Sequence, residues 1–269
     1  QNAEVKGAKL AEVKSSSQVQ LLDNSKLSSS TKTNITGKTV YTKNANITGG
    51  DVTTTASDTA TIYTGTNINA SGSASVVSAN QLYIANATVK GQKGVVAQST
   101  KGNAYINNST LNSTKGNVST NAAGATQVYN NSKITAGETA VFKGNNIYLT
   151  NSTTSAKNIN VNAQNQANLY GNAKLSAGKN ASITGKTIYT NNATLTGDGV
   201  TMVGNGSILL SEGTNIGANK NITVLSTKDQ VYTKGATLTS NNGQVNIGGA
   251  TTVALYNSKV NAPQITLVS

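Results

Sequence analysis

Short apolar stretches recur along the whole chain, separated by segments of Gly, Asn, Ser and Thr. Within the stretches apolar and polar residues alternate, as in Ile159-Asn160-Val161 and Val245-Asn246-Ile247. A period of two is typical of β-strands that bury one face, whereas the helical period of 3.6 residues is not evident. Gly, Asn, Ser and Thr are turn formers. The pattern therefore predicts an all-β chain of short strands joined by turns.

Tyrosines indicate the length of a repeat. Successive tyrosines lie 19 to 24 residues apart, except for one gap of 43 residues that Leu210 divides roughly in half. A repeat of about this length is typical of a solenoid. We expect a stacked core built from Tyr41, Tyr63, Tyr83, Tyr105, Tyr129, Tyr148, Tyr170, Tyr189, Leu210, Tyr232 and Tyr256.

A second series fixes the phase of the repeat. An Asn or Gly is followed by two small or polar residues and then, in most cases, by an aliphatic residue, as in Asn24-Ser-Lys-Leu27. Asn and Gly adopt positive φ more readily than other residues, so each coil is expected to turn a left-handed corner here. Stacked Asn amides can also hydrogen-bond along such a ladder. The twelve corner positions, 20 to 23 residues apart, are Asn24, Asn44, Gly65, Asn86, Asn108, Asn131, Asn151, Asn172, Asn192, Gly213, Gly235 and Asn257.

In each coil a third apolar centre lies about ten residues after the corner, for example at Ile35 and Ile183. Three short strands per coil and the usual hand of parallel crossovers predict a right-handed parallel β-helix (solenoid) of about 12–13 coils of ~21 residues. Stacking buries each coil against its neighbours, and twelve coils at ~4.8 Å would form a monomeric rod of roughly 60 Å. We expect one continuous β-helix over residues 1–269, a fragment of a longer filament, with residues 1–20 as an irregular first coil in which Gly7 would be a thirteenth corner.

The composition favours a core that extends along the axis of a solenoid over the compact core of a globular domain. Hydrophobic residues make up 36% and aromatics 4% of the 269 residues, and no Cys is present, which excludes disulfides and thiolate metal sites. No apolar run approaches the ~20 residues of a membrane-spanning helix. The net charge is +12, and every cation is a Lys. Because Arg makes the bidentate contacts to phosphate and guanine, a specific nucleic-acid partner is not expected.

The acidic residues do not form a catalytic pair. Asp51, Glu138 and Asp198 share a similar phase, but at least three coils, or roughly 14 Å, separate them. A glycosidase needs two carboxyl groups about 5–9 Å apart. We therefore expect no enzyme activity, no catalytic residues, no metal site and no cofactor.

Four lysines share one phase, two residues after the corner. They are either solvated side chains that oppose edge-to-edge aggregation or a weak contact surface for anionic ligands such as glycans. These positions are Lys26, Lys133, Lys174 and Lys259.

Degenerate coils of about 20 residues, rich in Asn, Gly, Thr and Ala and lacking Cys, resemble the filamentous haemagglutinin family over essentially the whole chain. The family comprises large exoproteins of Gram-negative bacteria exported by two-partner secretion, among them adhesins and contact-dependent growth inhibition effectors. The Asn-Pro motifs of the family's secretion domain are absent, since the only Pro is Pro263, so the resemblance is to shaft repeats. It implies an extracellular or outer-surface location and an outer-membrane transporter partner.

The leading functional hypothesis is a structural and adhesive rod segment of a large secreted bacterial surface protein. Such a segment would attach to a host or neighbouring cell surface, or present a distal domain. The alternatives are a passive stalk of a growth inhibition effector and, less favoured, a carbohydrate-active β-helix.

Overall fold

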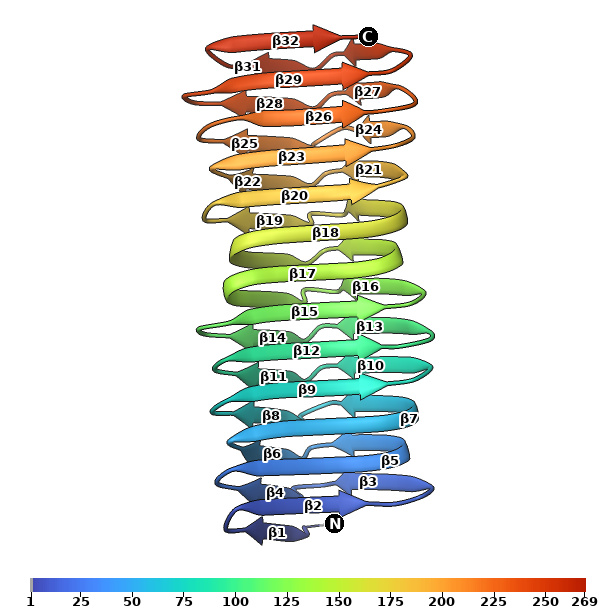
Figure 1. The fold of residues 1–269 in the computed structure, drawn as a ribbon, viewed down its shortest axis with the longest axis vertical. Coiled ribbons are helices and arrows are strands. Elements are labelled where there is room, and N and C mark those ends of the chain that lie inside the picture. Colours follow the sequence, from blue (N-terminus) through green and yellow to red (C-terminus); the bar gives the residue numbers. More distant parts are fainter. Residues whose placement is uncertain (1) are drawn as a thin grey trace. The chain divides into compact units, whose positions relative to one another are not determined.

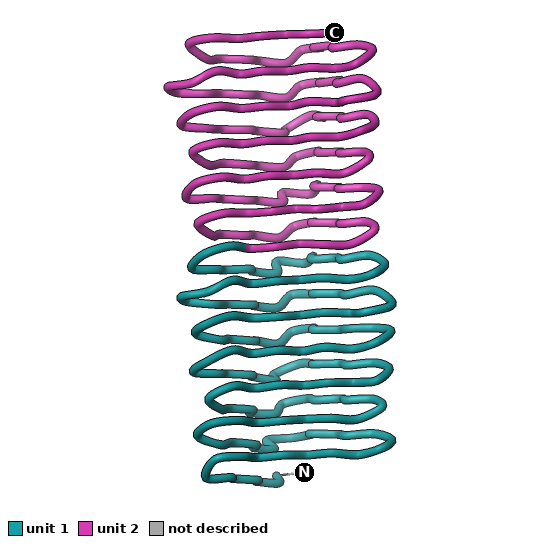
Figure 2. The backbone as a smooth tube through the Cα atoms, viewed as in Figure 1, with its two compact units in different colours: residues 1–139 teal, residues 140–269 magenta. Residues whose placement is uncertain are grey.

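The computed structural model describes residues 2–269 and divides into two compact units, Gln1–Thr139 and Ala140–Ser269 (Figure 2). Both are parallel β-solenoids, and the chain makes about 13 turns of ~21 residues. The described residues contain no helix, and so none that could cross a membrane. The predicted fold class is therefore confirmed. One continuous β-helix over residues 1–269 stays a prediction.

In the first unit each coil contributes a strand to three faces. The first face comprises β1 (Glu4–Gly7), β4 (Lys26–Ser29), β6 (Asn46–Gly49), β8 (Asn67–Ala70), β11 (Thr88–Gly91) and β14 (Thr110–Ser113). The second comprises β2 (Leu10–Lys14), β9 (Ser73–Ser78), β12 (Gly94–Ser99) and β15 (Asn117–Ala122), and the third β3 (Gln18–Leu22), β10 (Gln81–Ala85), β13 (Asn103–Asn107) and β16 (Ala125–Tyr129). Two longer strands bend from the second face into the third: β5 (Lys32–Lys43) and β7 (Asp51–Tyr63).

The second unit repeats this arrangement, and the boundary between the units falls within β17 (Lys133–Thr150). β18 (Thr153–Tyr170) runs through all three faces. The first face of this unit contains β19 (Lys174–Ala177), β22 (Thr194–Gly197), β25 (Asn215–Ala218), β28 (Thr237–Ser240) and β31 (Lys259–Asn261). The second has β20 (Asn180–Gly185), β23 (Gly199–Gly204), β26 (Ile222–Ser226), β29 (Gln244–Gly249) and β32 (Gln264–Val268), and the third β21 (Thr187–Asn191), β24 (Ile208–Leu210), β27 (Val231–Lys234) and β30 (Val253–Tyr256).

Within each unit every strand pairs in parallel with the equivalent strand of the next coil, as β10 does with β13. In Figure 1 the second-face strands lie in front and point to the right, and the chain returns behind them one level higher. That path is a right-handed screw, the hand that twisted parallel strands favour.

Alternate residues of each strand fill the interior. In the first unit the aliphatic residue three positions after each corner from Asn24 to Asn131 is 0–1% exposed and stacks on its equivalents, for example Leu27 on Ile47 and Ile47 on Ile68. Fully burying such a side chain contributes about 1.5–3 kcal/mol. Because this burial requires a neighbouring coil, stability comes from stacking rather than from any single coil.

The first described residues form a regular coil rather than the expected irregular one. β1 pairs with β4 and β2 with β5, so Gly7 stands opposite Ser29 at the end of a strand. The corner of this coil is Asn2, whose φ is +55° and whose N–H donates to the Asp23 carbonyl. Gly7 as a thirteenth corner is therefore wrong, because the corner lies five residues earlier.

The tyrosines do not lie in the core. Tyr83 stands between Leu82 and Ile84, both 0% exposed, and a strand directs neighbouring side chains to opposite sides. Every tyrosine of the expected core is half-buried or exposed on the outer surface of the third face: Tyr41, Tyr63, Tyr83, Tyr105, Tyr129, Tyr148, Tyr170, Tyr189, Tyr232 and Tyr256. Leu210 is buried, but it pairs with Thr190; the residue opposite Tyr189 is Leu209.

Candidate functional site

The predicted corners all have left-handed backbone. φ lies between +43° and +72° at each of Asn24, Asn44, Gly65, Asn86, Asn108, Asn131, Asn151, Asn172, Asn192, Gly213, Gly235 and Asn257. A left-handed conformation costs most L-residues about 1–2 kcal/mol, and Asn and Gly tolerate it best. The residue after each of the twelve corners is Ser, Ala or Thr, and at Ala45 and Thr66 it is fully buried.

Amide side chains link successive corners. The Asn108 amide donates to Asn86 Oδ1 at 2.7 Å, and the Asn192 amide donates to Asn172 Oδ1 at 2.9 Å. At Gly65 a side chain has no room, because a Cβ atom would lie 2.3 Å from Asn44 Oδ1. The corner ladder is thus engaged in holding coils together.

Within each unit the lysines of the first face share one row, as the sequence indicates, but they are not neighbours. In the first unit Lys26 and Lys133 occupy the same row with Asn46, Asn67, Thr88 and Thr110 between them. In the second unit Thr194, Asn215 and Thr237 separate Lys174 from Lys259. Strands about 4.8 Å apart place each pair roughly 19–24 Å apart, so neither pair forms a compact cationic cluster.

Three acids accept hydrogen bonds from a neighbouring coil, Asp51 and Asp58 from the next one and Asp229 from the preceding one. Asp51 Oδ1 accepts from the Ser73 N–H at 2.7 Å, Asp58 Oδ1 from the Asn80 amide at 2.7 Å, and Asp229 Oδ2 from the Ser207 hydroxyl at 2.5 Å. Two further acids lie in exposed ion pairs, Lys220–Asp198 at 3.9 Å and Lys234–Glu212 at 3.4 Å. Such surface pairs contribute little to stability. Among residues 2–269 no group of three His, Cys, Asp or Glu could hold a metal ion.

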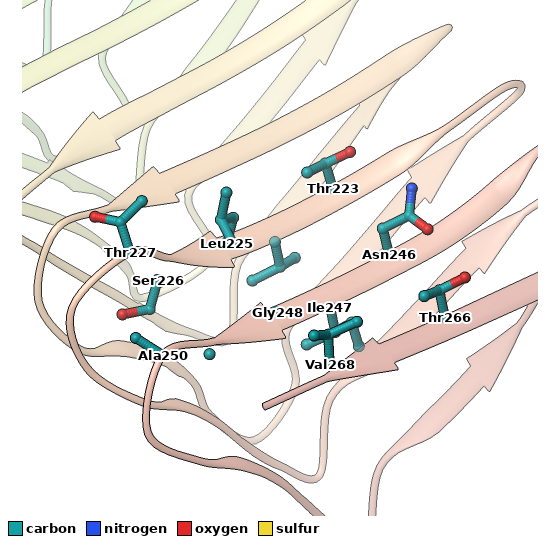
Figure 3. A pocket seen from close by; sticks show the side chains of 12 residues that line it. Thr223, Leu225, Ser226, Thr227, Asn246, Ile247, Gly248, Ala250, Thr266 and Val268 are labelled. Carbon is teal, nitrogen blue, oxygen red and sulfur yellow. The ribbon is translucent and has the colours of Figure 1, made fainter.

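An apolar hollow of about 560 Å³ opens on the outer second face of the second unit (Figure 3). It forms where Gly248 of β29 lacks a side chain between Leu225 of β26 and Val268 of β32. Thr223 and Asn246 also line it, and none of its lining residues is acidic or basic. The hollow therefore offers apolar contact but no acid–base group.

The outer surface of the third face of the first unit carries a series of tyrosines. Five consecutive coils, from β5 to β16, each present one tyrosine: Tyr41, Tyr63, Tyr83, Tyr105 and Tyr129. The Tyr83 and Tyr105 rings stack with centroids 4.7 Å apart and planes 8° apart, and the Tyr41 and Tyr63 centroids lie 6.3 Å apart at 36°. We call this surface the tyrosine face.

The tyrosines occupy two adjacent rows of this face. Tyr41, Tyr83 and Tyr105 share one row with Thr61, whereas Tyr63 and Tyr129 lie two residues further along their strands. Burial raises the pKa of Tyr129 above its ordinary value, and the nearby Tyr83 and Tyr105 hydroxyls raise it further. The last three tyrosines therefore form one electrostatically connected group.

Amides and hydroxyls surround these rings. The Asn103 amide donates to the Tyr105 hydroxyl at 3.0 Å, and the Asn130 amide donates to Asn107 Oδ1 at 2.9 Å. The spacing of the tyrosines in the sequence located the third face. The sequence-based expectation that their rings fill the core was wrong, because the rings lie on the outer surface of that face. Aliphatic residues on both sides of Tyr83 are the signal that could have placed its ring outside.

Comparison with known proteins adds no family, since no family model, curated protein or solved structure matches the chain.

Proposed function

We propose that this chain is a structural and adhesive segment of a large secreted bacterial surface protein, similar in kind to the shafts of filamentous haemagglutinins. The segment acts outside the cell and contacts a host or neighbouring cell surface without catalysing a reaction. It reaches the outer surface through an outer-membrane transporter partner.

One observation carries the adhesive role: the tyrosine face presents aromatic rings on five consecutive coils of the first unit. Tyrosine provides a large, rigid contact area at low cost in side-chain entropy and is frequent in binding surfaces. These rings are not needed to fill the core, because Leu, Ile, Val, Ala and Thr of the same strands fill it. Their outward placement on successive coils therefore favours a contact surface.

The lysine row supports a second candidate, a passive stalk of a growth inhibition effector. Lys26, Lys133, Lys174 and Lys259 are separated by neutral side chains within each unit. Isolated exposed lysines favour solubility and oppose edge-to-edge pairing of strands more than they favour the binding of an anionic ligand.

Binding of the purified chain to host-type cells, measured at low and at physiological salt, tests the adhesive role. We expect saturable binding that persists at physiological salt. Binding that disappears as salt rises would instead be the non-specific attraction of a chain with net charge +12. That result, or no binding, would favour the passive stalk.

A further inference from the structure

We infer that the tyrosine face binds a neutral, extended, linear polysaccharide that runs across the strands of the first unit. This inference rests on the proposed adhesive function and names the class of ligand. The surface consists of the outward side chains of β3, β10, β13 and β16 and of the third-face parts of β5 and β7, which are stacked at the rear of the first unit in Figure 1.

The rings are spaced for repeated contact. Adjacent strands of a sheet are about 4.8 Å apart, and each coil from β5 to β16 adds one tyrosine. The centroid separation of 4.7 Å for Tyr83–Tyr105 follows that spacing because the two residues are in register, whereas Tyr41 and Tyr63 lie in adjacent rows with centroids 6.3 Å apart. The stacked Tyr83 and Tyr105 rings cover part of each other's faces, so an extended β-1,4-linked chain meets their outward edges with the C–H groups and hydroxyls of its pyranose rings. One such chain can therefore contact several tyrosines in succession.

The side chains beside the rings match the hydroxyl groups of a sugar. Hydroxyls both donate and accept, and leaving one unpaired on binding costs free energy. The row next to the Tyr83 row contains only hydroxyl, amide and methyl side chains: Gln18, Thr39, Thr59, Gln81, Asn103 and Ala125. Thr61, Asn107 and Gln127 stand in the tyrosine rows themselves.

Charge selects a neutral ligand. The chain carries 21 lysines and a net charge of +12, yet Lys43 is the single lysine among the outward residues of the tyrosine face, and no Asp or Glu stands there. An anionic polymer would gain little from one cation, while desolvating its own charges is costly. A neutral polymer avoids that cost.

Polymer length should set the affinity. Each tyrosine–sugar contact is weak, but once one sugar is held the next contact on the same chain becomes intramolecular. Five tyrosines on successive coils therefore favour long chains over short oligosaccharides.

Affinity electrophoresis through gels containing hydroxyethyl cellulose, a neutral β-1,4-glucan derivative, tests the inference. We expect the polymer to retard the wild-type chain at low and at physiological salt alike, and short cello-oligosaccharides to compete poorly. The double variant Tyr83→Ala/Tyr105→Ala should bind about tenfold more weakly. Tyr83→Phe/Tyr105→Phe, which keeps both rings, should retain most of the binding.

Lys26→Ala/Lys133→Ala is the matched control, because it removes two exposed side chains of the same unit from another face. It should leave retardation unchanged, and circular dichroism should show that all variants are folded. Equal migration of the wild type with and without polymer would overturn the inference, as would retention by the tyrosine-to-alanine variant. Sedimentation that shows self-association lost in that variant would make a second copy the occupant instead. Cell attachment at physiological salt is measured in parallel: if it persists without polysaccharide binding, the ligand class is wrong and the adhesive function stands.

Discussion

Tyr83 and Tyr105 stack on the outer surface of the solenoid with their ring planes only 8° apart. Their positions are opposite one another in β10 and β13, so the parallel register of the strands itself sets the ring separation of 4.7 Å. Aromatic pairs of this kind contribute about 0.5–1.5 kcal/mol beyond the area that they bury. The pair therefore stabilises the stack modestly.

Because the Tyr105 ring is outside the core, Tyr105→Ala should lower the free energy of unfolding by only about 1–2.5 kcal/mol, from the lost ring stacking and the half-buried area of the ring. A tyrosine in the core would cost more, since truncating a buried aromatic residue removes about 3–5 kcal/mol. Urea denaturation followed by circular dichroism distinguishes the two. A loss of about 3–5 kcal/mol in the free energy of unfolding would contradict the placement of the Tyr105 ring outside the core.

The aliphatic neighbour should behave in the opposite way. Ile106 is 0% exposed and stacks between Ile84 and Val128. Ile106→Ala should destabilise the chain by about 2–5 kcal/mol, because it leaves a cavity that the stacked coils cannot close fully. The same urea experiment measures it, with Tyr105→Ala as the control from the adjacent position. An effect no larger than that of Tyr105→Ala would contradict the assignment of the core.

The corner ladder gives a third prediction. Asn108 has φ +43° and donates its amide to Asn86 Oδ1. Asn108→Ala should cost about 1.5–3.5 kcal/mol, the sum of about 1–2 for the left-handed backbone and about 0.5–1.5 for the hydrogen bond. Asn108→Gly also removes the hydrogen bond, but glycine adopts the left-handed backbone without strain. It should therefore cost less than Asn108→Ala in thermal or urea denaturation. Equal costs for the two variants would show that backbone strain is not what selects Asn.

A corner glycine should be harder to replace. At Gly65 φ is +72° and an added Cβ would meet Asn44 Oδ1 at 2.3 Å. Gly65→Ala should therefore cost more than backbone strain alone, and it should cost less when it is made in an Asn44→Ala background, which lacks the clashing oxygen. A double-mutant cycle in urea measures this coupling. Strict additivity of the two substitutions would rule out the clash as the cause.

The repeat was predictable from the sequence because its strongest signals are local. Asn and Gly at one spacing indicate a backbone conformation, and all twelve corners from Asn24 to Asn257 adopt it. The aliphatic residue that follows, such as Leu111, is buried because it must pack on its equivalents.

The direction of the tyrosines was harder to predict because both sides of a strand can carry apolar residues. In Val40-Tyr41-Thr42 the inward residues are Val40 and Thr42, and the polar Thr42 makes Tyr41 look like the core residue. Leu82-Tyr83-Ile84 settles the direction, since two aliphatic residues flank one ring. The shared phase of the lysines was also predicted correctly within each unit. The wide distances between them depend on which residues occupy the same row in the intervening coils, and only the strand register identifies those residues.

Ionisation of Tyr129 provides the last prediction. Burial, and then the neighbouring Tyr83 and Tyr105, raise the pKa of Tyr129 above its ordinary value near 10. A raised pKa in the folded state means that the folded chain holds this proton more tightly than the unfolded chain does. The associated stability is fully present below pH ~10 and is lost as pH rises through the higher folded pKa. Absorbance titration near 295 nm, a wavelength at which tyrosinate absorbs, should show a late-titrating component that Tyr129→Phe removes. Tyr83→Phe/Tyr105→Phe should shift that component to lower pH, because only desolvation would then raise the pKa of Tyr129. A component unchanged by Tyr129→Phe would contradict this assignment and the connected tyrosine group on which it depends.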